Sequence, residues 1–196
     1  MRNIKKGYEK KPTALKKIWW FLVKSDSLAS WLVDLLLLWL FIKFLFIPLL
    51  GVILATPSPP VIVRSSSMEH ISDFEQWWGE REQLYASYNI SKEDFVHFKF
   101  FNGIDRGDII IVKGYKGSKP KIGDVIVFDA KQPLPIIHRV IAIHNYTYET
   151  LGDKNFAQFP FEKNISEEQI LGRAVARIPK IGWAKLIFVL PFEKLK

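Results

Sequence analysis

The apolar residues of the chain form one long continuous run near the N-terminus. Residues 35–54 read LLLLWLFIKFLFIPLLGVIL, and sixteen of these twenty positions are Leu, Ile, Val or Phe. About twenty apolar residues span the hydrocarbon core of a bilayer as a helix. Lys43 opposes insertion by roughly 3 kcal/mol, less than the apolar residues contribute in favour; it either snorkels or pairs with an acidic group of a partner helix. We expect one transmembrane helix within residues 29–55.

Beyond residue 103 the apolar positions fall in short β-branched runs separated by turn residues. The segments GIDRGDIIIVKG (103–114) and KIGDVIVFDA (121–130) each place a Gly-Asp pair before such a run, and PIIHRVIAIH (135–144) follows. With the stiff spacer TPSPP and the short run VIVR before them, these patterns predict a mainly β, partly closed antiparallel domain over residues 56–196.

Residues 71–102 are more helical and more charged than their flanks, and they predict an inserted helical cap. Ser91 and Asp94 are typical of a helix start, and we expect the aromatic residues of the cap to pack on the β-domain. The C-terminal segment IGWAKLIFVLPF (181–192) is too short to cross a bilayer. It is interpreted as a segment on the outer leaflet, a buried strand or a core helix.

The net charge of +8 is concentrated before the apolar run. Residues 1–28 hold eight Lys or Arg against Glu9 and Asp26, whereas residues 56–196 hold 19 basic and 17 acidic groups. Basic flanks favour the cytoplasm, so residues 1–28 are expected inside as a basic arm, with ALKKIWWFLVK (14–24) as an interfacial amphipathic helix. The run begins too far from the N-terminus for a cleaved signal peptide. The remaining domain is therefore expected outside the cell membrane.

Several function classes are disfavoured by composition. The chain has no cysteine, and its four histidines include no HExxH pair, so no metal or other cofactor is expected. No nucleic-acid motif accompanies the nearly neutral outer region, so no nucleic acid is expected as a partner.

One strand pair brings together residues suited to acid–base chemistry. If a hairpin turns about Asn145 and Tyr146, His138 lies opposite Asp153. A carboxylate beside an imidazole lets the other ring nitrogen remove a proton from a serine hydroxyl. Ser67, within the run SSSM, is the candidate nucleophile, although a serine run by itself is typical of a polar loop.

Five segments resemble, in order, the conserved boxes of type I signal peptidases: SSSM (65–68), RGDIIIV (106–112), IGDVIVF (122–128), IIHRVI (136–141) and LGDKN (151–155). The resemblance is to the archaeal and endoplasmic-reticulum branch, in which histidine is the base. It implies Ser67 as nucleophile, His138 as base and Asp153 as orienting carboxylate. It also implies an oxyanion site formed by the Ser65 side chain and the Ser67 backbone N–H. Substrates of the family add as a β-strand, here against Ile62, Val63 and Arg64 on one side and Pro135, Ile136 and Ile137 on the other, with Met68 as a pocket wall.

Three positions depart from the family pattern. Ser66 replaces a usual Gly, His70 replaces a Pro, and the later aspartate that can complete the triad is missing. Glu162 is therefore the reserve carboxylate, and His70 is a rival base because it lies three residues from Ser67.

The leading hypothesis is a single-pass membrane serine endopeptidase that removes N-terminal signal peptides from exported pre-proteins after small residues at positions −1 and −3. Its implied partners are these signal peptides, the lipid bilayer and the protein translocation channel. The alternative is a non-catalytic anchored β-module that binds extended peptides or scaffolds a secretion complex. Asn89, Asn145 and Asn164 lie in N-x-S/T sequons, which leave glycosylation open.

Overall fold

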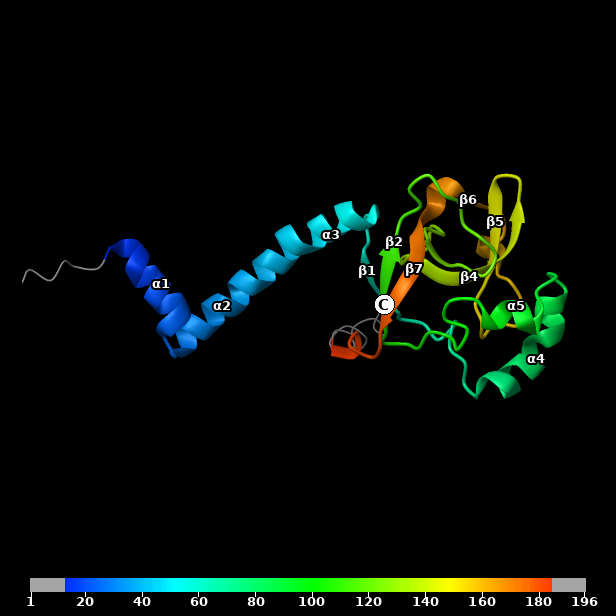
Figure 1. Ribbon diagram of the computed structural model, residues 1–196, viewed down its shortest axis with the longest axis horizontal. Coiled ribbons are helices and arrows are strands. Elements are labelled where there is room, and N and C mark those ends of the chain that lie inside the picture. Colours follow the sequence, from blue (N-terminus) through cyan, green and yellow to red (C-terminus); the bar gives the residue numbers. More distant parts are fainter. Residues whose placement is uncertain (1–12, 185–196) are drawn as a thin grey trace, which may run out of the picture. The chain divides into compact units, whose positions relative to one another are not determined.

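The computed structural model describes residues 13–184, and these form two compact units that divide after Pro48 (Figure 1). The first unit holds α1 (Ala14–Lys24) and α2 (Leu28–Phe41), with the π-helical turn η1 (Ile42–Phe46) after them. Residues 1–12 of the expected basic arm lie outside the described residues.

The apolar run forms one long helix. The helix α3 (Ile47–Leu54) continues η1, so residues Leu28–Leu54 make 27 helical residues, enough by length and composition to cross a bilayer. Ser27 caps the start by accepting the backbone N–H of Ser30 at 3.2 Å. The π-turn lies just before Pro48, whose ring clashes with the carbonyl four residues earlier in a regular helix. The expected N-terminal apolar helix is confirmed.

Seven strands form one antiparallel, half-barrel sheet in the second unit. The sheet order is β1-β2-β7-β3-β4-β5-β6. The strands are β1 (Pro60–Ile62), β2 (Ile109–Lys113), β3 (Val125–Phe128), β4 (Ile136–His144), β5 (Thr147–Leu151), β6 (Ile165–Ser166) and β7 (Ile170–Ile178). The β-branched runs after the Gly-Asp pairs supply β2 and β3, because such side chains pack well on a pleated surface. The predicted fold class is confirmed.

The strand β7 was not anticipated, although it lies at the centre of the sheet between β2 and β3. Its sequence ILGRAVARI combines apolar and basic residues, and its register is interrupted by bulges against both neighbours. Single-turn 3-10 helices, η2 (Pro160–Glu162) and η3 (Glu167–Gln169), lie on either side of β6.

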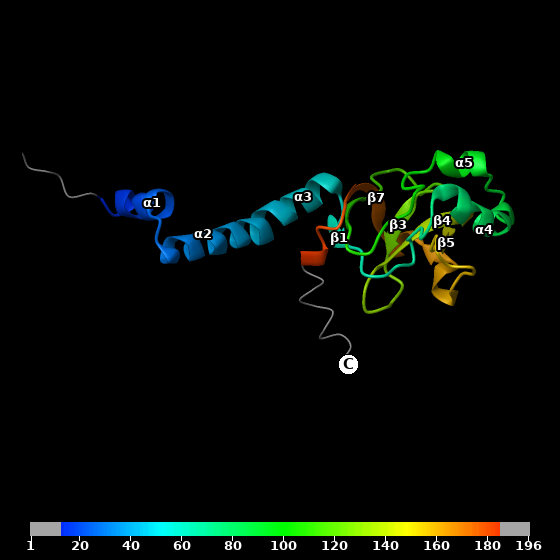
Figure 2. The ribbon, with the colours of Figure 1, turned by 90° about the horizontal axis from the view of Figure 1, so that it is seen from below.

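The inserted segment contains α4 (Phe74–Ala86) and α5 (Lys92–Val96), which lie beside β4 and β5 (Figure 2). An aromatic cluster joins them to the sheet; its buried members are Trp77, Trp78, Tyr85, Ile90, Phe95, Ile141 and Leu151. The cap therefore packs on the β-domain as expected. Ser91 caps α5 in a capping box with Asp94, which confirms the predicted helix start. Of the C-terminal segment 181–192, residues 185–192 lie outside the described residues.

Candidate active site

The candidate nucleophile lies in a turn directly after the edge strand β1. On one side of the turn, the carbonyl of Val63 accepts the N–H of Gly107 at 2.9 Å; on the other, the carbonyl of Met68 accepts the N–H of Ile104 at 2.8 Å. The Met68 side chain is buried in the core beneath the turn. Ser67 is thus presented on a short loop that is fixed at both ends.

The hydroxyl of Ser67 meets the imidazole of His138. The distance from Oγ of Ser67 to Nε2 of His138 is 2.9 Å, although the two residues are 71 positions apart in the chain. His138 belongs to β4 and is 4% exposed. Oγ of Ser65 lies 3.1 Å from Oγ of Ser67, so a second hydroxyl lies beside the candidate nucleophile.

The carboxylate on the far side of the imidazole belongs to Glu162. Its Oε1 lies 2.5 Å from Nδ1 of His138, but off the direction of the ring N–H, so the contact is a close approach rather than an aligned hydrogen bond. The other oxygen, Oε2, accepts the backbone N–H of Phe159 at 2.6 Å. Glu162 is fully buried, and the η2 turn holds it against the base.

The expectation that Asp153 lies opposite His138 is wrong, and the cause is a β-bulge. The hairpin does turn at Asn145 and Tyr146, and Ala142 pairs with Glu149 in the predicted register. Between Val140 and Ala142 the register shifts by one residue, so that Val140 pairs with Thr150. Continued along β4, this register places Gly152 opposite His138.

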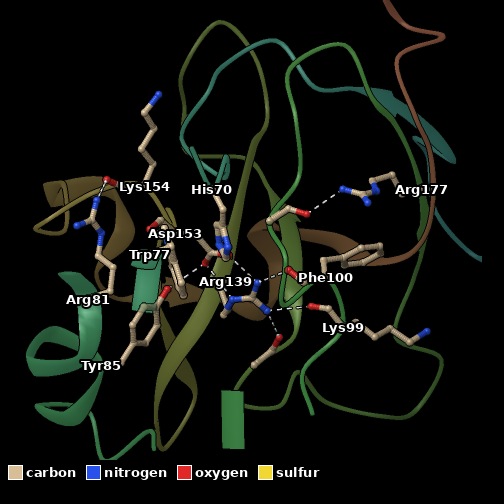
Figure 3. Close-up of polar contacts among 12 residues, drawn as sticks. His70, Trp77, Arg81, Tyr85, Lys99, Phe100, Arg139, Asp153, Lys154 and Arg177 are labelled. Carbon is tan, nitrogen blue, oxygen red and sulfur yellow. Dashed lines mark hydrogen bonds and ion pairs between the residues drawn. The ribbon is translucent and has the colours of Figure 1, made fainter. Parts of the chain in front are cut away.

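Asp153 lies instead in a buried polar cluster (Figure 3). Arg139 donates to both of its carboxylate oxygens, from Nε at 2.9 Å and from an Nη at 2.6 Å, and the Tyr85 hydroxyl donates at 3.0 Å. The remaining Arg139 donors reach the carbonyls of Lys99, Phe100 and Gly123. Burial alone would raise the pKa of the Asp153 carboxyl, but the Arg139 charge and the hydrogen bonds from His70 and Arg139 lower it to about 2.

His70 faces this cluster. Its Nε2 lies 3.2 Å from Asp153, its side chain is 3% exposed, and its ring stacks on Trp77 with centroids 3.6 Å apart. The hydrogen bond of the Ser67 hydroxyl to an imidazole goes to His138, and the one of His70 goes to Asp153. The geometry favours His138 over His70 as the base.

Gly152 packs closely against both the nucleophile and the base, so that no side chain fits at this position. A Cβ atom at this position would lie 2.8 Å from the Ser67 carbonyl oxygen and 2.9 Å from Nε2 of His138. The segment after Gly152 also contacts the nucleophile turn, since the N–H of Lys154 donates to the Ser67 carbonyl at 2.9 Å. The sequence analysis did not identify Gly152, although its place in the LGDKN box marks the segment.

A mostly apolar cleft of about 300 Å³ opens beside Ser67 and His138. All seven predicted substrate-binding residues line it: Ile62, Val63, Arg64, Met68, Pro135, Ile136 and Ile137. The sequence analysis missed four further lining residues, Val61, Leu134, Phe159 and Phe161. Phe159 directly precedes the η2 turn that carries Glu162, Phe161 lies within it, and their rings stack with centroids 5.3 Å apart.

The described residues hold no group of three or more His, Asp or Glu side chains placed to bind a metal ion. Beside the cleft, a hydroxyl, an imidazole and a carboxylate lie in series. Such a series can transfer a proton from the hydroxyl and turn it into a nucleophile.

Comparison with known proteins gives distant relatives. No protein-family model matches the chain. It is similar to the signal peptidase complex catalytic subunit SEC11 of Komagataella phaffii (31% identity over 98 residues, 42% of this chain and 57% of the relative). It is also similar to those of Dictyostelium discoideum (28%; 42% and 51%) and Clavispora lusitaniae (29%; 42% and 55%). The chain is thus a distant homologue of these catalytic subunits, and it spans about half the length of the curated relatives it matches.

Proposed function

We propose that this chain is a membrane-bound serine endopeptidase of the signal peptidase type, with Ser67 as nucleophile, His138 as general base and Glu162 as the orienting carboxylate. The observation that carries the proposal is the series from Oγ of Ser67 to Nε2 of His138 at 2.9 Å, and from Nδ1 of His138 to Glu162 at 2.5 Å. The distant homology to signal peptidase catalytic subunits supports the same reaction.

In the proposed reaction, Oγ of Ser67 attacks the carbonyl carbon of the scissile peptide bond while His138 takes the hydroxyl proton. The negative oxygen that forms is stabilised by the Ser67 backbone N–H and by the Ser65 hydroxyl. Collapse of this intermediate breaks the C–N bond, and His138 gives its proton to the leaving amine. Water, activated by His138, then releases the acyl group from Ser67.

The substrate is proposed to bind as an extended strand in the cleft. One wall of the cleft comes from β1, which is an edge strand of the sheet. The other wall comes from residues 135–137, where β4 begins. β5 pairs with β4 only from Arg139 onward, so a segment of β4 stays open for main-chain pairing. Shallow subsites beside Met68 would accept small residues at positions −1 and −3.

The expected location follows from the apolar helix and the charges around it. Leu28–Leu54 would be a single span, with the basic arm in the cytoplasm and the catalytic domain outside. The substrates would be signal peptides of exported pre-proteins as they leave the translocation channel.

Cleavage of a pre-protein by the purified full-length chain in detergent, beside a Ser67→Ala variant, tests the proposal. We expect cleavage after the signal peptide by the wild type and none by Ser67→Ala. Equal cleavage by both proteins would refute the assignment of Ser67. A chain that binds the signal peptide but never turns it over would be the non-catalytic peptide-binding module instead, and trapping of an acyl group on Ser67 would exclude that alternative.

A further inference from the structure

We propose that the inserted helix α4, with the turn after it, is a brace that positions the nucleophile and the orienting carboxylate, and that its positioning residues are Trp77, Arg81 and Tyr85 on the helix and Tyr88 in the turn. This inference rests on the proposed peptidase function and assigns a role to the insertion, which none of the family's sequence boxes covers.

Three of the four positioning residues lie on one side of the helix, and the fourth lies in the turn that follows it. Trp77, Arg81 and Tyr85 follow each other at intervals of four, which places them on one face of α4, and Tyr88 comes in the turn after it. All four extend a polar tip toward residues 153–158. A helix that merely covered the sheet would need apolar contacts on this face, but not a donor at each of these positions.

Each of the four side chains donates a hydrogen bond to that segment, and Figure 3 shows how Trp77, Arg81 and Tyr85 lie around Asp153 and Lys154. The Trp77 indole N–H reaches the Asp153 carbonyl at 3.2 Å, and the Tyr85 hydroxyl reaches the Asp153 carboxylate at 3.0 Å. Arg81 donates to the Lys154 carbonyl at 2.9 Å, and its guanidinium lies 3.6 Å from the centre of the Phe156 ring. Tyr88 donates to the side chain of Gln158 at 3.1 Å.

The braced segment is in turn bonded to the catalytic groups. The N–H of Lys154 donates to the Ser67 carbonyl, so the position of residues 153–154 sets the position of the nucleophile turn. Gln158 immediately precedes Phe159, whose N–H holds the Glu162 carboxylate, and the Gln158 amide is itself fixed to the Thr150 carbonyl at 3.1 Å. The helix therefore reaches Ser67 through Lys154, and the turn after it reaches Glu162 through Gln158 and Phe159.

The brace also holds the nucleophile turn from its other end. His70, three residues after Ser67, is stacked on Trp77 and bonded to Asp153. A histidine restricts its own backbone far less than a proline does. Here the order of this segment comes from its contacts with α4 and with the cluster around Asp153.

The experiment compares removal of two brace hydroxyls with removal of a matched hydroxyl elsewhere. The brace variant is Tyr85→Phe/Tyr88→Phe, and the control is Tyr115→Phe, which loses a tyrosine–carboxylate hydrogen bond of 2.9 Å to Asp124 away from the cleft. Values of kcat and KM for a pre-protein are measured well below each variant's Tm. We expect the brace variant to lose at least tenfold in kcat with KM changed less than twofold, because a small misplacement of reacting groups slows chemistry more than binding. The control should keep its kcat, although its Tm falls.

A brace variant with kcat within twofold of the wild type would overturn the proposal. Hydrogen exchange separates this failure from failure of the proposed function. If wild type and Ser67→Ala are equally inactive, the peptidase assignment is refuted. The brace is then tested by the hydrogen-exchange rate of the Lys154 amide. Faster exchange there in the brace variant, but not in Tyr115→Phe, would retain the brace; unchanged exchange would remove it.

Discussion

Glu162 and Ser67 lie on opposite sides of the His138 ring, with Oε1 of Glu162 2.5 Å from Nδ1 and Oγ of Ser67 2.9 Å from Nε2. A buried carboxylate next to one ring nitrogen favours a proton on that nitrogen and leaves the other free to accept one. Glu162 therefore holds the position that the sequence analysis gave first to Asp153 and in reserve to Glu162.

Replacement of Glu162 by Gln tests this arrangement. The amide keeps the size of the side chain but cannot stabilise the imidazolium, and it can present its NH₂ group to Nδ1. We expect kcat to fall by roughly 10²–10⁴-fold with little change in KM. Circular dichroism and the Tm should show an intact fold, and retained turnover in Glu162→Gln would contradict the assignment.

The matched variant Asp153→Asn should behave differently, because Asp153 neutralises the fully buried Arg139. Loss of one partner of a buried ion pair typically destabilises a protein by about 3–5 kcal/mol. We expect a large decrease in Tm, and residual activity in the fraction that stays folded. Chemical denaturation of the β-domain measures the effect, and a variant as stable as wild type with no activity would support a catalytic role for Asp153.

The strands could be predicted wherever the pattern was local. A Gly-Asp turn before a β-branched run located β2 and β3, and the apolar run located the long helix. β7 was not predicted from the sequence. Its place inside the sheet is set by pairing with β2 and β3, which are distant in sequence. Its own apolar pattern is interrupted by basic residues and by bulges.

The site shows the same division between local and distant determinants. Ser67, His138 and the seven predicted residues that line the cleft were named from motifs that resemble a known family. The first choice of carboxylate, Asp153, does not lie opposite His138, because one bulge in β4 shifts the hairpin register, and a shift of one residue moves side chains to the other face. Glu162 was named only in reserve. The position of Glu162 depends on the η2 turn, which the sequence pattern of FAQFPFE does not reveal.

Gly152→Ala should impair catalysis more than folding. The added methyl would lie 2.8 Å from the Ser67 carbonyl oxygen and 2.9 Å from Nε2 of His138, so one of the two must move. We expect a decrease in kcat of at least tenfold, measured with the pre-protein assay.

Gly79→Ala in α4 is the matched control: its Cβ would meet nothing within 4 Å, and the change should stabilise the helix by about 0.5–1 kcal/mol with no effect on kcat. Equal activity of both variants would show that the contact at Gly152 is unimportant.

Acid should destabilise the β-domain through Asp153. Its pKa is lowered to about 2 in the folded chain, below the value of about 3.9 for an unfolded aspartate. The resulting stabilisation, about 2.6 kcal/mol, is complete above the unfolded pKa and is lost as the pH falls through the folded pKa. Denaturant titrations between pH 5 and roughly pH 2 should show this decrease in the free energy of unfolding. The decrease should be smaller in Asp153→Asn, and an identical slope in both proteins would assign the acid sensitivity to other groups.

Main-chain pairing in the cleft can be tested on the substrate rather than on the protein. If the substrate adds as a strand between β1 and residues 135–137 of β4, methylation of one backbone nitrogen removes a donor and introduces a clash with the facing strand. Each lost hydrogen bond is worth about 1 kcal/mol, so we expect kcat/KM to fall by about fivefold or more for alternate amides just before the cleavage site. Alternate residues matter because successive N–H groups of a strand point to opposite edges, and β1 and β4 form the two walls.

A peptide methylated several residues beyond this segment is the control and should be cleaved normally. Equal cleavage of every methylated peptide would mean that side chains alone hold the substrate and that the open edges of β1 and β4 do not bind it.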